Sequence, residues 1–182
     1  FTWGDIDFFM LDNRYDRSPN QRKSGERTIL GKIQKEWLKD VLASSKASFK
    51  IVIMGGQFLN DAAKYEMYSN DGFHEERQEI IDFIQNENIR NVVFLNGDRH
   101  HSEFSVLKKE NFPTIYDLTV SPLTSGTHAG APREKNTLRV PKSLISNRNF
   151  ALIEVSGKRK HRKMSIKIMD QKGKINFKAN IN

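Results

Sequence analysis

The sequence predicts an α/β fold in which βαβ units are followed by antiparallel strands. In the first half, short apolar runs alternate with segments whose apolar residues recur every three to four positions, as in βαβ units. In the second half, strand-like runs are separated by polar turns that contain glycine, which is typical of antiparallel hairpins. The length of 182 residues suits one domain.

The first half contains three strand candidates and two helix candidates. Residues 6–11, 49–54 and 91–95 are short runs rich in branched and aromatic side chains. Residues 29–42 and 75–87 carry apolar residues at helical spacing. The apolar positions of the first helix candidate are Ile29, Leu30, Ile33, Trp37, Leu38, Val41 and Leu42. Because the strand candidates are mostly apolar, we expect a sheet that is covered on its faces.

The second half contains five further strand candidates and one long irregular segment. The strand candidates are residues 104–107, 115–120, 150–155, 164–169 and 175–179. Residues 121–149 include three prolines and two glycines, and we expect neither helix nor strand there. A loop of this length in a compact domain is usually either functional or disordered. His128 lies in it, either at the rim of a site or exposed to solvent.

The composition excludes several classes of protein. Hydrophobic residues make up 37% of the chain, and 12 Phe, 4 Tyr and 2 Trp can fill a core, so we do not expect a wholly disordered chain. No apolar run reaches the roughly 18 residues of a membrane helix. The absence of cysteine excludes disulfides and thiolate-bound metals but leaves the redox compartment open. With 30 basic and 22 acidic side chains, the formal net charge is +8.

Gly-Asp-Arg-His-His, residues 97–101, is the most informative local motif. It follows the apolar strand candidate directly, and ligands of α/β sheets bind beyond the carboxyl ends of strands. Asp98 and His100 could both face one cation, and a carboxylate with an imidazole suits Fe, Mn or Zn, whereas the carboxylate alone also suits Ca. The alternative is an ordinary turn in which the aspartate caps backbone amides and the histidines lie at the surface.

The neighbours of Asp98 and His100 add possible roles. Arg99 and His101 could contact anionic oxygens, and Glu103 could orient a histidine from behind the site.

Two other strand ends carry polar residues. Asp12-Asn13-Arg14 follows the first strand, where Arg14 offers a planar fork for phosphate or carboxylate and Asp12 could hold it. Gly55-Gly56-Gln57 follows the second, and its glycines permit close approach of a ligand. Taken singly, a surface ion pair and an ordinary turn explain these two segments better. Together with residues 97–101, however, they favour one shared active-site edge.

A basic run occupies residues 158–163, Lys-Arg-Lys-His-Arg-Lys, between two strand candidates. Clustered cations can bind nucleic acid because they release counterions from phosphates. No aromatic residues are interleaved with them for stacking on bases. We therefore interpret the run as a solvated hairpin tip.

A series of short motifs runs through the chain. The most specific are Leu-Asp-Asn-Arg at residues 11–14 and Gly-Asp-Arg-His at residues 97–100. Others are Phe-Thr-Trp-Gly-Asp at 1–5, Ile-Leu-Gly at 29–31, Gly-Gly-Gln at 55–57, Ser-Pro-Leu-Thr-Ser-Gly at 121–126 and Arg-Asn-Phe-Ala at 148–151. In this order they resemble the PhoD-like alkaline phosphatase/phosphodiesterase family, within the calcineurin-like metallophosphoesterase superfamily.

The resemblance implies a fold, an activity and a metal site. The fold would be half of an α/β/β/α sandwich, and the activity would be hydrolysis of phosphate mono- or diesters by an exported enzyme. Two or more metal ions (Fe, Ca, Mn or Zn) would lie at one edge of the central sheets. Asp98 and His100 would be metal ligands from this chain.

The remaining site residues follow from the same resemblance. We expect catalytic roles for Arg14, Arg99 and His101, which would face the charge that develops on phosphoryl oxygens. We expect Asp12 and Gln57 to bind the substrate or to support the site.

The chain also departs from the family pattern. The family draws most of its metal ligands from an N-terminal half with Gly-Asp-x-x-Tyr and Asp-Asp-His motifs, and neither motif occurs here. The chain begins at Phe1 without an initiator Met or a signal-like segment. We therefore expect residues 1–182 to be the C-terminal portion of a single catalytic domain, inactive in isolation, with the N-terminal half of the same protein as its partner.

Two other functions are compatible with the sequence. One is a basic, non-enzymatic domain that binds nucleic acid or another polyanion, although we do not expect nucleic acid as the partner. Its binding would weaken steeply with ionic strength. The other is a remnant of the fold that holds no metal.

Overall fold

The computed structural model describes residues 1–62, 67–69 and 72–182, and it has the predicted α/β class. Six strands form the larger sheet: β1 (Thr2–Trp3), β2 (Ile6–Met10), β3 (Phe49–Ile53), β4 (Val92–Asn96), β5 (Glu103–Leu107) and β6 (Ile115–Thr119). Their spatial order is β1-β2-β3-β4-β6-β5. The four inner strands β2, β3, β4 and β6 are parallel, and β1 and β5 are antiparallel strands at the two sides.

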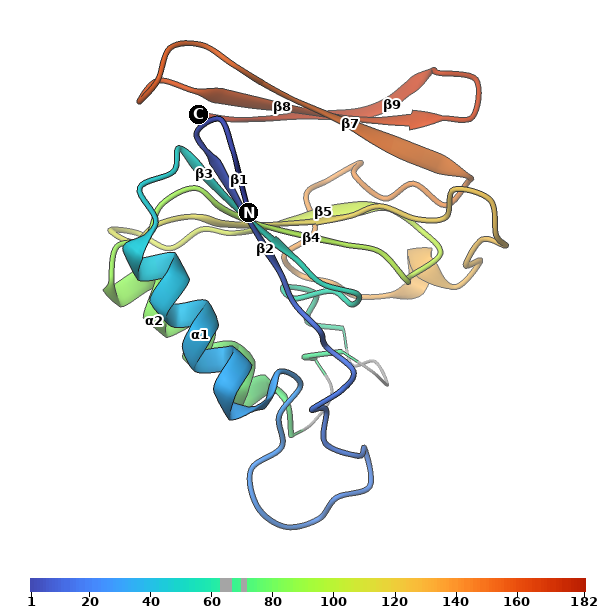
Figure 1. Cartoon of the computed structure of the whole chain (residues 1–182). Coiled ribbons are helices and arrows are strands. Elements are labelled where there is room, and N and C mark those ends of the chain that lie inside the picture. The colour runs from blue at the N-terminus through green and yellow to red at the C-terminus, as the bar shows by residue number, and fades with distance from the viewer. Residues whose placement is uncertain (63–66, 70–71) are drawn as a thin grey trace.

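Helices cover one face of this sheet and a second sheet covers the other (Figure 1). Helix α1 (Gly31–Ser44) connects β2 to β3, and α2 (His74–Asn86) lies between β3 and β4. The second sheet is an antiparallel meander of β7 (Asn149–Ser156), β8 (Lys163–Asp170) and β9 (Ile175–Ile181). The order of elements along the chain therefore matches the expectation of βαβ units followed by antiparallel strands.

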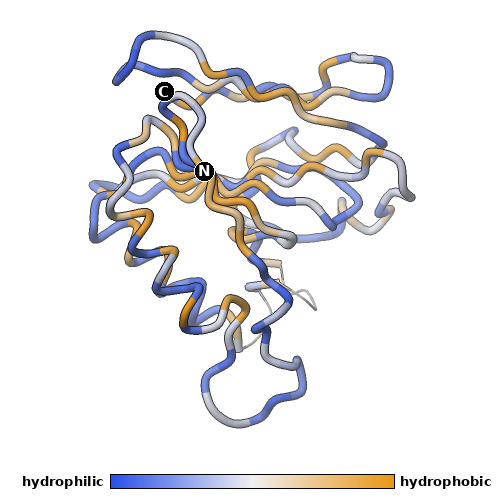
Figure 2. Tube along the Cα trace, viewed as in Figure 1, coloured by the Kyte–Doolittle hydropathy of each residue, from blue (hydrophilic) through white to orange (hydrophobic). Residues whose placement is uncertain are grey.

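Two hydrophobic cores lie on the two faces of the larger sheet. Because side chains alternate along a strand, Val52 of β3 packs under the helices with Leu38, whereas its neighbour Ile51 packs between the sheets with Ile166. Hydrophobic segments follow the strands of both sheets, and the connecting loops are largely hydrophilic (Figure 2). Because the inner strands are buried on both faces, their sequences are largely continuous apolar runs and do not alternate between apolar and polar residues.

Helix α1 buries a narrower stripe than its sequence predicts. Leu38 and Leu42 are almost fully buried, but Ile33 is 86% exposed and Trp37 is 43% exposed. Ile33 and Trp37 are four residues apart and share a stripe beside the buried one. There Trp37 contacts Phe9 of β2 edge-on, with ring centroids 6.3 Å apart. The seven apolar residues at helical spacing therefore do not all face the core, because Ile33 is exposed and Trp37 is only partly covered.

Residues 121–149 are irregular, as expected, apart from one short 3-10 helix, Ala131–Arg133. The segment follows the outer side of β5, where bridges join Ser102 to Ile145 and Ser105 to Arg139. These pairings continue the sheet past its last strand and hold the long loop against the domain.

The basic run forms the turn between β7 and β8, which confirms the predicted hairpin tip. Lys160 and Lys163 line a hollow together with Ser48 and Asn91, which directly precede β3 and β4. The turn therefore lies at the amino edge of the parallel strands, opposite their carboxyl ends.

The burial difference along α1 can be tested by truncation. Leu38→Ala should lower the free energy of unfolding by about 2 to 5 kcal/mol, because it leaves a cavity between α1 and the sheet. Ile33→Ala, on the same helix, should change it by less than about 0.5 kcal/mol. Urea unfolding followed by circular dichroism measures both variants. Equal losses would contradict the orientation of α1.

Candidate active site

The three predicted strand ends meet at one edge of the sheet. The backbone amide of Gly55 donates to Oδ1 of Asn13 at 3.0 Å, which joins the turn after β2 to the turn after β3. The guanidinium of Arg99 donates through Nε to Oε1 of Gln57 at 3.0 Å, which joins the turn after β3 to the turn after β4. The structure therefore brings together the segments that the sequence placed at a shared edge.

The turn after β4 exposes two potential metal ligands. Asp98 and His100 are exposed, and both adopt left-handed backbone conformations, with φ of 65° and 56°. Only a few per cent of non-glycine residues do so, and such positions are concentrated at functional sites. Nδ1 of His100 donates to the carbonyl oxygen of Gly126 at 2.6 Å, since a carbonyl can only accept. Nε2 of the neutral ring therefore keeps its lone pair.

Arg99 is held in place from two sides. Its Nε contacts Gln57, and its Nη2 forms an ion pair with Glu134, whose side chain is 2% exposed. The Arg99 side chain keeps 14% of its surface exposed. Nε2 of His128 lies 3.1 Å from the same Glu134 oxygen. Arg99 is therefore a fixed cation at the edge that carries Asp98 and His100.

A buried carboxylate lies beneath this edge. Oε1 of Glu103 accepts hydrogen bonds from the amides of Gln57 at 2.6 Å, Asn60 at 2.9 Å and Asn136 at 3.0 Å. Its Oε2 forms an ion pair with Arg139. A buried carboxylate is tolerated when it is paired and hydrogen-bonded in this way. The network fixes the Gln57 amide and, through it, the Arg99 guanidinium.

His101 is fully buried beside this network. Its Nδ1 donates to the carbonyl oxygen of Arg99 at 2.9 Å, and burial lowers the pKa of the ring. Its Nε2 is 3.8 Å from Oε2 of Glu103, which exceeds hydrogen-bond distance. Glu103 was expected to orient a histidine, but its hydrogen bonds go to amides and to Arg139. His101 holds the backbone of Arg99 and has no access to solvent.

Asp12 and Arg14 lie on the exposed turn after β2. Oδ1 of Asp12 accepts the backbone amides of Arg14 at 2.8 Å and Tyr15 at 3.1 Å, and these hydrogen bonds lower the pKa of Asp12. Gln34 of α1 bonds to the backbone amide and carbonyl of Asp12. The sequence suggested that Asp12 could hold the Arg14 guanidinium, and in the structure these hydrogen bonds hold the backbone of the turn that carries Arg14.

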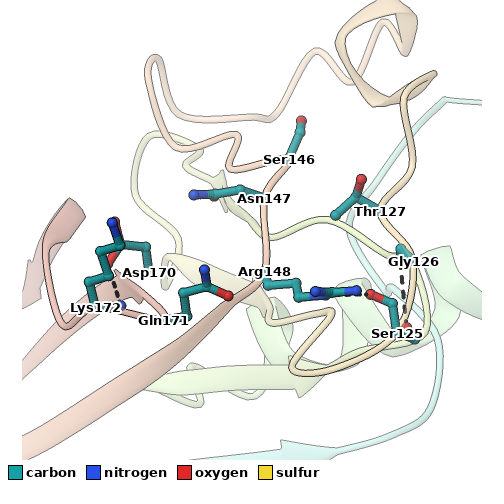
Figure 3. Close-up of a pocket in the computed structure, with 9 residues that line it drawn as sticks. All are labelled: Ser125, Gly126, Thr127, Ser146, Asn147, Arg148, Asp170, Gln171 and Lys172. Atoms are coloured by element: carbon teal, nitrogen blue, oxygen red, sulfur yellow. Dashed lines mark hydrogen bonds between the residues drawn. The ribbon is translucent and has the colours of Figure 1, made fainter.

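A polar hollow of about 580 Å³ adjoins His100. Residues 125–127, which carry the carbonyl that binds His100, form one wall. Asp170, Gln171 and Lys172 line it from the β8–β9 turn. Arg148 extends across toward Ser125 and donates to its carbonyl oxygen at 3.2 Å (Figure 3). Hydroxyl, amide and charged groups dominate the lining, as a polar ligand requires.

Comparison with known proteins identifies the family of this chain. The profile of PhoD-like phosphatases matches residues 1–179. The chain belongs to the PhoD-like phosphatase family. It is 33% identical over 120 residues to alkaline phosphatase D of Bacillus subtilis (strain 168), which covers 56% of this chain and 21% of that protein. A solved structure of PhoD superposes with a TM-score of 0.70 at 25% identity, covering 93% of this chain and 37% of the other.

These coverages define how much of the family this PhoD-like chain represents. It spans about a fifth of the B. subtilis relative and just over a third of the solved PhoD chain. The resemblance first drawn from short motifs is thus confirmed for the family and for the fold.

Two side chains at this edge have the chemistry of metal ligands. Asp98 and His100 fit a metal ion chemically, because His100 presents a lone pair at Nε2 while Gly126 fixes its ring. No partner among the described residues hydrogen-bonds the Asp98 carboxylate. Within residues 1–62, 67–69 and 72–182, however, no three His, Asp or Glu side chains converge so that they could hold a metal ion.

Several supporting residues were not found from the sequence. Asn60, Glu134 and Asn136 are buried polar residues in loops, and nothing local distinguishes them from exposed loop residues. Asn13 lies within the 11–14 motif, but its buried position is not visible in the sequence. Asp117 is different, because a carboxylate inside the apolar strand candidate 115–120 was a visible signal.

Asp117 of β6 anchors the loop that follows Gln57. Its Oδ2 accepts the backbone amides of Phe58 at 2.9 Å and Leu59 at 2.6 Å, and its Oδ1 accepts the side-chain amide of Asn96. Burial raises the pKa of Asp117 to about 6, although these hydrogen bonds oppose the rise. The carboxyl group is therefore protonated in the folded protein at pH values where it is ionised in the unfolded chain.

This difference predicts a pH-dependent stability. Between pH 3.8, the ordinary pKa, and about pH 6, Asp117 loses its proton in the unfolded chain but keeps it in the folded protein. The free energy of unfolding should therefore fall as pH rises through this range, by on the order of 3 kcal/mol. Asp117→Asn should remove this component. Asn96 Nδ2 donates to this carboxylate in the wild type, so the Asn96 side-chain amide must rotate by about 180° for the new amide to donate to its Oδ1, a buried oxygen without a partner among the described residues. Urea unfolding at pH 4 and pH 7 measures the difference.

Asp40→Asn, an exposed change on α1, is the matched control and should keep the wild-type pH dependence. If wild-type protein and Asp117→Asn lose the same stability between pH 4 and pH 7, Asp117 does not have the raised pKa.

Proposed function

We propose that this chain is the C-terminal portion, residues 1–182, of the catalytic domain of a metal-dependent phosphatase or phosphodiesterase. The observation that carries the proposal is the turn after β4, which presents Asp98 and His100 on either side of a fixed arginine. Membership of the PhoD-like family supports the reaction class. A phosphate ester bound at this edge would lie near both the candidate metal ligands and the Arg99 guanidinium.

Asp98 and His100 are the proposed metal ligands of this chain. Carboxylate oxygen and imidazole nitrogen suit Fe, Mn or Zn, and the carboxylate also suits Ca, as the sequence indicated. Two or more ions bound there would polarise a phosphoryl oxygen and activate water for in-line attack. The hydrogen bond from His100 to Gly126 orients the ring and selects the tautomer with a free Nε2.

The arginines are proposed to bind the phosphoryl group. Arg99, held by Gln57 and Glu134, is preorganised to stabilise charge on the equatorial oxygens without reorientation. Arg14, on the exposed turn after β2, would approach the same group from the neighbouring strand end. Gln57 and His101 are buried, and we propose that they position Arg99 rather than contact the ester.

The polar hollow beside His100 is the proposed site for the alcohol portion of the ester. It shares the 125–127 wall with the His100 hydrogen bond, so a group in the hollow lies next to the proposed metal ligand. Asp12 would act on substrate binding indirectly, through the backbone of the turn that carries Arg14.

The proposed partner is the N-terminal half of the same protein. Of the ten large apolar side chains exposed in the described part of the chain, six lie from Phe1 to α1. These six are Phe1, Trp3, Met10, Tyr15, Ile33 and Trp37. A largely apolar hollow of about 470 Å³ also opens between β2 and β7. Such a surface is typical of a region that another part of a protein covers.

Cellular location forms part of the same proposal. None of the helices in the described ranges is both long and apolar enough to span a bilayer. We expect the complete protein to be exported, as the resemblance to the PhoD-like family implies.

The metal assignment predicts the behaviour of two variants of the complete enzyme. His100→Ala removes a ligand and Asp98→Asn removes a charge, so each should lower metal content and ester hydrolysis by about 10-fold or more. Elemental analysis and turnover of a chromogenic phosphate ester measure the two effects. Asp40→Asn and His74→Ala, both exposed on helices, should leave metal content unchanged. Undiminished metal in both site variants would show that the assignment is wrong.

The ligand count predicts that residues 1–182 alone do not catalyse the reaction. Two ions require several more ligands than Asp98 and His100, so the isolated chain should not hydrolyse a phosphomonoester or diester with Mn, Fe, Ca or Zn. Adding the N-terminal half in trans should restore turnover. Chelator-sensitive turnover by a monomer of this chain would contradict the proposal. A remnant without catalytic function would stay inactive even with the N-terminal half.

A further inference from the structure

A second hollow, of about 550 Å³, lies at the amino edge of the parallel strands, at the opposite ends of the strands from the proposed active site. We call it the amino-edge hollow. Three segments distant in sequence form it: residues 46–50 before and within β3, residues 90–91 before β4, and residues 160–163 of the β7–β8 turn. Their cationic side chains are Lys46, Lys50, Arg90, Lys160, Arg162 and Lys163.

These charges are poorly compensated. No Asp or Glu side chain lines the hollow. Arg162 alone forms an ion pair there, through its Nε to both Asp5 oxygens at 3.0 and 3.1 Å. Within the described ranges, Lys46, Lys160 and Lys163 have no carboxylate partner.

Lys50 shows that the positive charge extends below the surface. The residue is 7% exposed, and Nζ donates to the carbonyl oxygens of Ala47 at 3.1 Å and Arg90 at 3.3 Å. An ammonium has three donors, so one remains beyond these two hydrogen bonds. Asp7 is the nearest opposite charge and lies on the neighbouring strand β2.

We propose that the amino-edge hollow binds a small polyanion that carries two or three phosphate groups. Converging cations repel one another, and a multivalent anion relieves this repulsion at all of them together. A volume of about 550 Å³ lies in the range of small-molecule sites and exceeds the size of one phosphate. No Phe, Tyr or Trp lines the hollow, so it lacks the large aromatic surfaces on which single-stranded nucleic acid stacks its bases.

The site is independent of the proposed catalysis. Its residues precede the parallel strands, whereas Asp98 and His100 follow one of them (Figure 1). Binding there should therefore survive removal of metal by a chelator. This separation lets the experiment distinguish the two sites.

The test is calorimetric titration of the 182-residue chain with inorganic tripolyphosphate in EDTA, at 50 mM and 200 mM salt. Wild-type protein should bind, and affinity should fall with salt. The triple variant Lys46→Gln, Lys160→Gln, Lys163→Gln should bind at least 10-fold more weakly. The control Lys23→Gln, Lys135→Gln, Lys178→Gln removes the same charge at exposed positions outside the hollow and should bind within about twofold of wild type.

Circular dichroism and thermal unfolding confirm that both triple variants fold. No binding of tripolyphosphate, or equal weakening in both variants, would overturn the proposal, because the second result would show a net-charge effect only. Tighter binding of a DNA oligonucleotide or of phosphatidylserine vesicles through the same three lysines would also overturn it and assign the surface to that macromolecule.

Discussion

The parallel pairing of β2, β3, β4 and β6 is the constraint on which the rest of this structure depends. Strands that run in the same direction end at the same edge, so the turns at residues 12–14, 55–57 and 97–101 meet although they are far apart in sequence. The connecting helices return the chain across one face, which leaves the other face for the second sheet (Figure 1). The same geometry separates the proposed active site from the amino-edge hollow. The proposed active site lies at the carboxyl ends of the parallel strands, and the amino-edge hollow lies at their amino ends.

The carboxyl edge is ordered from beneath by buried polar groups. Glu103 accepts hydrogen bonds from three side-chain amides and forms an ion pair with an arginine. Asp117 accepts hydrogen bonds from two backbone amides and one side-chain amide. A buried carboxylate destabilises a fold unless its oxygens are hydrogen-bonded, but a satisfied network permits only one arrangement of its members. Gln57 belongs to the Glu103 network and follows directly into the segment that Asp117 holds. The position of Arg99 at the surface therefore depends on charges that lie out of contact with solvent.

The polarity and charge of the exposed surface differ from one side of the domain to another. Apolar side chains are exposed along β1, β2 and α1, whereas the carboxyl edge is polar and the amino edge is cationic. The chain corresponds to 37% of the solved PhoD chain, and the apolar side is where we place the contact with the N-terminal half. Under the proposed function, Asp98 and His100 would be the contribution of this chain to a site that the N-terminal half completes.

The fold class and the position of most elements could be predicted from the sequence alone, because apolar periodicity indicates whether a segment forms a helix or a strand. The sequence also singles out Asp98 and His100 as candidate metal ligands, since a strand followed by Gly-Asp-x-His is a local pattern. The exposure of Ile33, the burial of His101 and the ion pair between Glu134 and Arg99 could not be predicted from the sequence, because each depends on tertiary packing. The amino-edge hollow likewise could not be predicted from local sequence, because its segments come together through strand pairing in the larger sheet and through packing of the second sheet against it. These properties depend on which distant segments pack together, and local spacing carries no information about that packing.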